Sequence, residues 1–152
     1  MKAGDKISFK AIYSKSATRF GLNIKDKDGN YMFRLAFRLP TDPTGSGPIN
    51  VMNSRVDGIW GVELRAPFPK FEDGREFTVT VECLEDRFVA YFNGELMSGV
   101  DFPYRDDLAN AAEFELWGGD AMGDNGVPIL YLGIYDGELH KLFPLRDFSE
   151  RI

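Results

Sequence analysis

The stretch YMFRLAFRLP, Tyr31–Pro40, alternates large apolar side chains with polar or small ones. A period of two is typical of a β-strand that buries one face and leaves the other open. The residues expected in the core are Phe33, Leu35, Phe37 and Leu39. The residues expected on the opposite face are Arg34, Ala36 and Arg38. The stretch therefore predicts a half-buried strand whose open face carries two arginines.

The same alternation recurs on both sides of this strand, in short segments separated by Gly, Pro, Asn and Asp. Further strands are expected at 6–13, 20–25, 49–55, 77–84, 87–97, 112–120 and 127–135. Asn93-Gly94 is the strongest hairpin turn signal, and GDAMGDNG (119–126) also reads as a hairpin turn. One short helical turn is expected within 104–114. Many short strands with almost no helix predict an all-β fold, an antiparallel β-sandwich of two sheets.

Length and charge narrow the class of protein. The 152 residues suit one domain, 1–152. A net charge of −6 repels phosphate backbones, so nucleic-acid binding is not expected. No apolar run suits a signal peptide or a membrane span, so we expect cytosolic synthesis, with any secretion by a non-classical route. The single cysteine, Cys83, excludes an internal disulfide and falls at a buried strand position.

A polar surface is expected if the strands around Tyr31–Pro40 are neighbours. It would carry Arg34, Arg38, Asn53, Glu63 and Arg65, with Trp60 at its edge. Arginine donates hydrogen bonds, glutamate accepts them and asparagine does both, while a tryptophan face packs against the C–H patch of a sugar ring. An Arg–Glu network would hold these groups in place before a ligand arrives. The combination points to a carbohydrate-binding surface.

The residues VMNSRVDGIWGVELRAPFPKFEDG (51–74) closely resemble the galectin signature, in which Asn-Ser precedes a Trp-Gly-x-Glu-x-Arg segment. AGDKISFKA, FGLNIK, FPYR and LWGGDA are similar to other galectin segments, so the resemblance covers roughly residues 3–135. It implies a jelly-roll sandwich, a lectin that binds β-galactosides and related glycans on its concave sheet without a metal or other cofactor. Galectins often associate through sheet edges, so the resemblance keeps a homodimer among the expected assemblies.

The resemblance also implies roles for individual residues. By position, Asn53 would contact the galactose O6 hydroxyl, and Trp60 would stack under the galactose ring. Glu63 would bridge the sugar and the arginines, and Arg65 would reach the second sugar.

The segment RLAFR (34–38) departs from the family's His-x-Asn-Pro-Arg. Arg38 keeps the final arginine, whereas Arg34 replaces the histidine and Ala36 replaces the asparagine. The family reads the axial galactose 4-hydroxyl with that histidine and asparagine, so an altered sugar preference is expected. The long loop around 39–50 is expected to add contacts at the far end of the groove. The alternative is a galectin fold that has lost sugar binding and acts through protein contacts.

The end of the chain departs from the family as well. Galectins usually add edge strands before the first matching segment, whereas this chain continues past residue 135. The hypothesis is that 136–152 supplies the missing edge strand, since an unpaired edge invites aggregation. Trp117 is expected to pack inside the sandwich and His140 to lie on the surface.

An enzyme is not expected. The only histidine, His140, lies near the end of the chain, so Ser-His or Cys-His triad chemistry has no obvious base. No His/Cys cluster has metal-ligand spacing. Glycoside hydrolysis needs two acids across one groove, and only Glu63 is placed there. Its expected pairing with arginines makes Glu63 a poor general acid.

Overall fold

The computed structural model describes residues 1–135, and nearly every element in this part of the chain is a strand. In chain order they are β1 (Lys6–Ile12), β2 (Arg19–Asp26), β3 (Tyr31–Arg38), β4 (Ile49–Val56), β5 (Ile59–Trp60), β6 (Leu64–Ala66), β7 (Glu76–Cys83), β8 (Arg87–Phe92), β9 (Glu95–Pro103), β10 (Ala111–Gly118) and β11 (Leu130–Tyr135). A 3-10 helix, η1 (Leu108–Asn110), forms within the segment expected to make one helical turn. The all-β prediction is confirmed.

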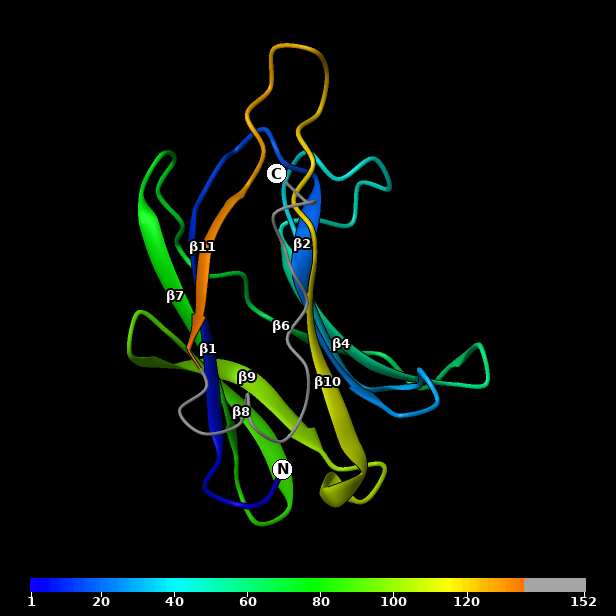
Figure 1. Cartoon of the computed structure of the whole chain (residues 1–152). Coiled ribbons are helices and arrows are strands. Elements are labelled where there is room, and N and C mark those ends of the chain that lie inside the picture. Colours follow the sequence, from blue (N-terminus) through cyan, green and yellow to red (C-terminus); the bar gives the residue numbers. More distant parts are fainter. Residues whose placement is uncertain (136–152) are drawn as a thin grey trace.

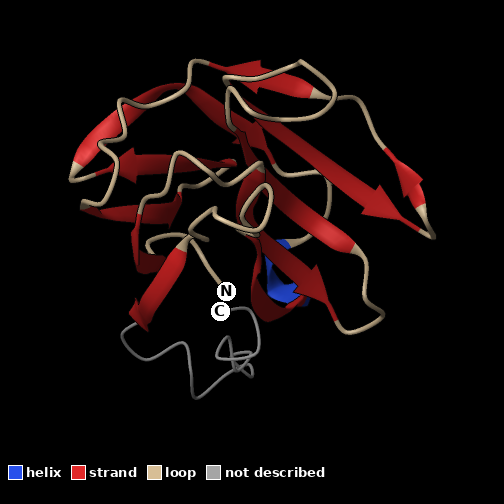
Figure 2. Ribbon diagram, turned by 90° about the horizontal axis from the view of Figure 1, so that it is seen from above, coloured by secondary structure: helices blue, strands red, loops and turns tan. Residues whose placement is uncertain are grey.

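The strands form two antiparallel sheets that pack face to face, as the side view and the view from above both show (Figures 1 and 2). One sheet has the order β11-β1-β7-β8-β9. The other has the order β10-β2-β3-β4-β5, and β6 pairs with another part of β4. The six-stranded sheet curves, so that its outer face is hollowed (Figure 1). This outer face carries the candidate site.

Phenylalanine dominates the core between the sheets. The largest fully buried side chains are Phe9, Phe20, Phe33, Phe37, Phe88, Phe102 and Phe114. Phe33 of one sheet stacks on Phe88 of the other with ring centroids 4.7 Å apart. Full burial of such a side chain contributes about 1.5–3 kcal/mol to folding. Because these side chains must face the core, they fix the register of the strands that carry them.

The register predicted for β3 is confirmed. Its expected core residues, together with the leucine that follows the strand, are completely buried: Phe33, Leu35, Phe37 and Leu39. The alternate residues Arg34, Ala36 and Arg38 consequently lie on the outer face and line a cavity there. A shift of one residue would exchange these two sets and place the arginines in the core.

Cys83 is fully buried at the end of β7, as its strand phase predicted. Burial raises the pKa of the Cys83 thiol to about 12. The reactive thiolate is therefore scarce at neutral pH, and the residue acts as a small core side chain.

The segment 119–126 does not close a hairpin, and that expectation was wrong. β10 belongs to the six-stranded sheet and β11 to the five-stranded sheet, so the connection crosses between sheets. It begins at Gly118 and Gly119, whose φ angles are 68° and 90°. A Cβ at Gly118 would lie 2.5 Å from the Arg19 carbonyl oxygen. Glycine and aspartate signal a change of direction but do not say to which sheet the next strand returns.

Trp117 also lies elsewhere than predicted. Phe114 and Leu116 enter the main core, and the alternation along β10 places Trp117 on the outer face of the sheet. It is nevertheless 9% exposed, because it packs with Ala36 and Val51 in a second, small apolar cluster. The prediction judged Trp117 by its apolar character and missed its strand phase.

Residues 136–152, including His140, lie outside the described residues. The hypothesis that they supply an edge strand therefore stays a prediction. Within residues 1–135, no helix combines the length and the apolar character that crossing a membrane requires.

Candidate functional site

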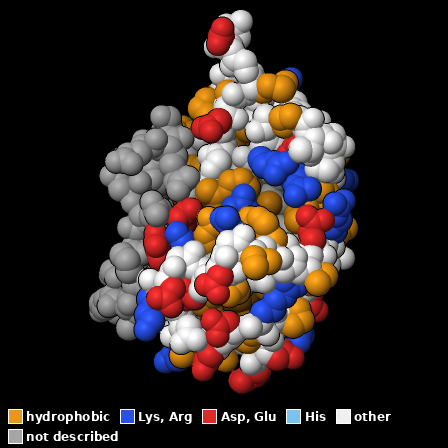
Figure 3. Space-filling model, turned by 90° about the vertical axis from the view of Figure 1, so that its right-hand side faces the viewer, with side chains coloured by type: hydrophobic (Ala, Val, Ile, Leu, Met, Phe, Trp, Pro, Cys, Tyr) orange, Lys and Arg blue, Asp and Glu red, His pale blue; other side chains and the backbone are white. Residues whose placement is uncertain are grey.

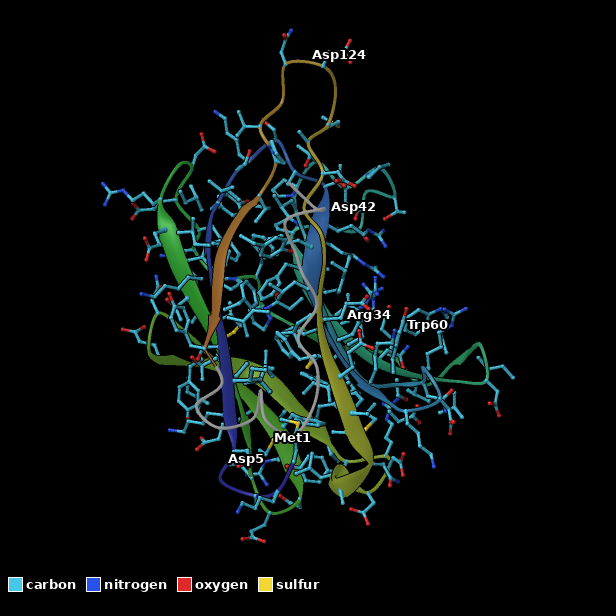
Figure 4. The ribbon with its side chains drawn as sticks, viewed as in Figure 1. Met1, Asp5, Arg34, Asp42, Trp60 and Asp124 are labelled. Carbon is cyan, nitrogen blue, oxygen red and sulfur yellow. The ribbon has the colours of Figure 1, made fainter. Side chains whose placement is uncertain are left out.

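A cavity of about 360 Å³ opens on the hollowed outer face of the six-stranded sheet. It is lined by Arg19, Arg34, Ala36, Arg38, Val51, Asn53, Trp60 and Glu63, and we call it the groove. Figure 4 shows Arg34 and Trp60 projecting from this side of the sheet, with Asp42 nearer one end. The volume is typical of a site for a small ligand.

Strand register brings the groove residues together, because directly opposed residues on antiparallel strands share a face. Three cross-strand rows pass over the groove. In strand order they are Glu115, Asn23, Arg34 and Asn53, then Trp117, Gly21, Ala36, Val51 and Arg65, then Arg19, Arg38 and Ile49. Residues far apart in sequence thus form one continuous surface.

Glu63 joins two arginines at one side of the groove. Its Oε1 accepts from Arg38 Nη2 at 3.4 Å, and its Oε2 accepts from Arg65 Nε at 2.8 Å. Arg38 Nη1 donates to Ser46 Oγ at 3.1 Å, in the long loop between β3 and β4. The predicted Arg–Glu network is therefore present. Such charge-assisted contacts hold the side chains in one arrangement before a ligand binds.

Arg34 packs on an aromatic ring within the groove. Its Cζ lies over the Trp117 ring, 3.6 Å from the ring centroid, and no hydrogen bond joins its guanidinium to any residue among 1–135. Burial lowers the pKa of Arg34 to about 10, which leaves it charged at neutral pH. Gly21 makes room for the indole, since a Cβ there would lie 3.0 Å from Trp117 Cζ2.

Trp60 also lines the groove, close to Arg34. Its side chain remains 45% exposed, unusually open for an indole next to a well-formed core. The Cζ atoms of Arg34 and Arg55 lie 5.5 Å and 5.3 Å from its ring centroid, and the Tyr31 ring is 5.7 Å away. These cation–π contacts orient the ring while leaving apolar surface open to a ligand.

Arg105 supports the groove from outside its lining. It follows β9, and its guanidinium donates to Asn53 Oδ1 at 3.1 Å, to Ser54 Oγ at 2.9 Å and to the Val62 carbonyl at 2.6 Å. Gly61 lies where these groups converge, and a Cβ there would be 2.7 Å from Arg105 Nη1. Arg105 therefore ties the Trp60-bearing connection to β4.

Replacing Arg105 by alanine is expected to loosen this connection without unfolding the protein. The backbone N–H of Gly61, which donates to the Ser54 carbonyl at 2.9 Å, should exchange with deuterium about tenfold faster. Losing several hydrogen bonds lowers the local opening free energy by roughly 1–2 kcal/mol. Arg87→Ala, at another arginine on the far sheet, is the matched control. Equal exchange at Gly61 in both variants would contradict the role given to Arg105.

Arg19 and Asp42 form an ion pair at the end of the groove nearest the long loop. Arg19 Nε and Nη2 donate to the two Asp42 oxygens at 2.6 Å and 3.0 Å. Thr44 donates to Asp42 through both its backbone N–H and its hydroxyl. The Arg19 hydrogen bond, reinforced by those of Thr44, holds the pKa of Asp42 well below its usual range. The pair fixes both Arg19 and the loop.

Five of the six residues predicted for the site line the groove: Arg34, Arg38, Asn53, Trp60 and Glu63. The sixth, Arg65, adjoins it through Glu63. Sequence reasoning missed Arg19, Trp117 and Arg105. Arg105 is the last residue of FPYR (102–105), a segment that resembles galectins, so this resemblance could have identified it. Arg19 and Trp117 can be assigned to the groove only when β2 is paired with β3 and β10 with β2. Among residues 1–135, no three acidic, histidine or cysteine side chains gather as a metal site.

Comparisons with known proteins agree with this architecture. A family model described as galactoside-binding lectin matches residues 1–122. The structure of a toad ovary galectin in complex with thio-digalactose has a TM-score of 0.70 at 22% identity, covering 89% of this chain and 90% of that chain. Sheep galectin-11 in complex with glycerol gives 0.68 at 18%, covering 89% and 90%. Xenopus laevis galectin-Ib gives 0.66 at 24%, covering 89% and 92%. No curated protein matches the sequence.

Proposed function

The chain belongs to the galactoside-binding lectin family, and from that premise we propose that the groove binds glycans containing β-galactosides or related sugars. The observation that carries this proposal is the half-exposed Trp60 ring beside the Arg38–Glu63–Arg65 network. The ring offers apolar area to the C–H face of a sugar, and the network offers fixed donors and acceptors to its hydroxyls.

The residue roles follow this geometry. Trp60 stacks under the sugar ring. Asn53, on the neighbouring strand β4, contacts a hydroxyl of the sugar. Asn53 is already oriented, because its Nδ2 donates to the Gly61 carbonyl at 3.0 Å while Arg105 donates to its Oδ1. Glu63 accepts from sugar hydroxyls. Arg65, whose side chain is half exposed, reaches the next sugar. A similar structure supports the proposal that the ligand is a sugar, since a toad ovary galectin was also solved in complex with N-acetylgalactose.

We propose further that sugar preference is altered. Arg34 and Ala36 stand where galectins carry the histidine and asparagine that read the axial 4-hydroxyl. Ala36 joins Val51 and Trp117 in an apolar cluster and offers no side-chain hydrogen bond. A lost hydrogen bond in a desolvated site costs about 1–3 kcal/mol. Plain galactosides are therefore expected to bind less tightly than in family members that keep both residues.

One observation favours a second candidate, a galectin fold that acts through protein contacts. Two guanidinium groups, those of Arg34 and Arg55, lie within 6 Å of the Trp60 ring centroid and compete with a sugar for its surface. In this case Trp60 would be a structural partner of the arginines and not a platform for a ligand.

Trp60→Ala tests the proposed function. The variant is expected to bind glycans at least about 30-fold more weakly than the unmodified protein, because a central aromatic contact contributes about 2 kcal/mol or more. The measurement is a broad glycan array with lactose competition, followed by titration calorimetry on the glycans that bind. Since Trp60 is half exposed, the melting temperature should change little.

Trp60→Phe is the matched control, since it retains a smaller apolar ring and is expected to lose only part of the affinity. A well-folded unmodified protein that binds no glycan on the array would overturn the lectin proposal and support the protein-contact candidate. Unchanged binding by Trp60→Ala would place the site away from the groove.

A further inference from the structure

We propose that the groove selects glycans bearing an anionic substituent, a sulfate ester or a carboxylate, with Arg34 as the residue that recognises it. This inference rests on the proposed lectin function and specifies the class of its ligand. The substituent would sit between Trp60 and Arg19, on the part of the sugar that faces away from Arg65.

The charges in and beside the groove carry the first step. Arg19, Arg34 and Arg38 line the groove and Arg65 adjoins it, while the guanidinium groups of Arg55 and Arg105 contact Trp60 and Asn53 from outside the lining. Two carboxylates oppose them, Asp42 on Arg19 and Glu63 on Arg38 and Arg65. The first four of these arginines and the two carboxylates together carry an excess of two positive charges, in a chain whose net charge is −6. Figure 3 shows Lys and Arg side chains clustered beside hydrophobic ones near the middle of this face.

The partners of each arginine carry the second step. Arg19, Arg38 and Arg65 each have a carboxylate within hydrogen-bond distance. Arg34 has none among residues 1–135, and the rings of Trp117, Trp60 and Tyr31 surround its guanidinium. An arginine carries five N–H donors. Within residues 1–135 no hydrogen bond occupies those donors, so they can serve a ligand.

Desolvation decides what kind of ligand fits best. Burial is the main cause that lowers the pKa of Arg34, and the opposing electrostatic effects of Tyr31 and Glu115 on one side and of Arg19 and Arg38 on the other are smaller. Burial therefore makes the cation costly in the empty groove. A neutral hydroxyl offsets this cost with one hydrogen bond, whereas an anionic oxygen offsets it with a charge-assisted, bidentate contact.

Neighbouring side chains hold the Arg34 guanidinium in a position where it can bind an anionic group. The Trp117 ring lies beneath the guanidinium at 3.6 Å, which fixes its plane and so reduces the ordering cost of binding. Ala36 and Val51, next to Arg34 in the lining, add no competing charge. Along the same sheet, Glu115 pairs with Lys25 Nζ at 3.3 Å. Arg34 is therefore a specificity-determining residue.

Titration calorimetry with four probes tests the proposal: lactose, lactose sulfated on its galactose, sialylated lactose, and inorganic sulfate alone. At about 50 mM salt, at least one anionic galactoside is expected to bind tenfold or more tightly than lactose. The preference should shrink at about 500 mM salt, where charges are screened over a few ångströms. Inorganic sulfate, lacking the sugar ring for Trp60, should bind weakly or not at all. Preference for the sulfate or for the carboxylate identifies the natural source of the anion.

Arg34→Gln, which keeps donors without charge, should reduce the tenfold preference to less than twofold. Arg34→Lys should retain part of it, and this second variant separates loss of charge from loss of packing on Trp117. Arg87→Gln, on β8 of the opposite sheet, is the matched control and should leave the preference intact. Anionic and neutral galactosides that bind equally would overturn this inference while leaving the lectin proposal standing. Failure of lactose and all anionic forms to bind would instead remove the proposed function itself. An undiminished preference in Arg34→Gln would refute the role of Arg34.

Discussion

Gly21→Ala is expected to lose more than about 3 kcal/mol of unfolding free energy, or to fail to fold. A Cβ at Gly21 would lie 1.9 Å from the Leu35 carbonyl oxygen and 3.0 Å from Trp117 Cζ2. The first contact is with backbone in the centre of the sheet, where nothing flexible can move aside. Overpacking at a rigid position costs typically about 1–3 kcal/mol and more when backbone must shift. Denaturant unfolding followed by circular dichroism measures the loss.

The control separates steric conflict from the general effect of replacing a glycine. Gly74 lies in open space with a φ of 76°, so Gly74→Ala should cost only about 1 kcal/mol of backbone strain. If Gly21→Ala were no more destabilising than Gly74→Ala, the close approach of β2 to β3 at this point would be wrong.

Asp42→Asn is expected to cost about 2–4 kcal/mol of stability at pH 7. The Asp42 side chain is completely buried, while that of Arg19 is 32% exposed. Removing the charge leaves the guanidinium without its bidentate partner and weakens two hydrogen bonds from Thr44. Loss of one partner from a buried pair costs about 3–5 kcal/mol, and partial exposure of Arg19 moderates the figure here.

The same pair predicts a dependence on pH. Because the pKa of Asp42 is lower in the folded state than in the unfolded chain, its stabilisation is fully present above about pH 4, the ordinary carboxyl pKa. It declines as the pH falls from there toward the folded-state pKa. Urea midpoints at several pH values should show this decline in the unmodified protein and less of it in Asp42→Asn. Asp124→Asn, in an exposed loop, should follow the unmodified protein; parallel curves for all three would contradict the assignment.

Local patterns predicted the parts of the fold that depend on neighbouring residues. The alternation from Phe33 to Leu39 fixed the inward face of β3, and the positions of Asn53 and Trp60 followed from one hairpin. Two strands that are close in sequence, β3 and β4, supply most of the groove lining, and Trp60 of β5 and Glu63 follow shortly after them in the chain. This closeness is why these residues were predictable.

The parts that were missed depend on pairing between distant segments. Trp117 reaches the groove only because β10 pairs with β2, which pairs with β3. Arg105 lies after β9 and donates a hydrogen bond to Ser54 of β4, which is far from it in the sequence. The connection 119–126 has the composition of a turn whether it returns to the same sheet or crosses to the other. No local pattern contains this information, because the long-range packing of the two sheets decides it.

The placement of both tryptophans on the hollowed face gives the protein an intrinsic optical probe. Trp60 and Trp117 are the chain's two indoles, and the Arg34 guanidinium lies within 6 Å of each ring centroid. Essentially all emission excited at the red edge of the indole band therefore arises beside the groove. The open indole should emit at longer wavelength than the enclosed one. Binding of a ligand in the groove is thus expected to change both the wavelength and the intensity of the tryptophan emission. In Trp60→Phe, Trp117 alone would report movement of Arg34.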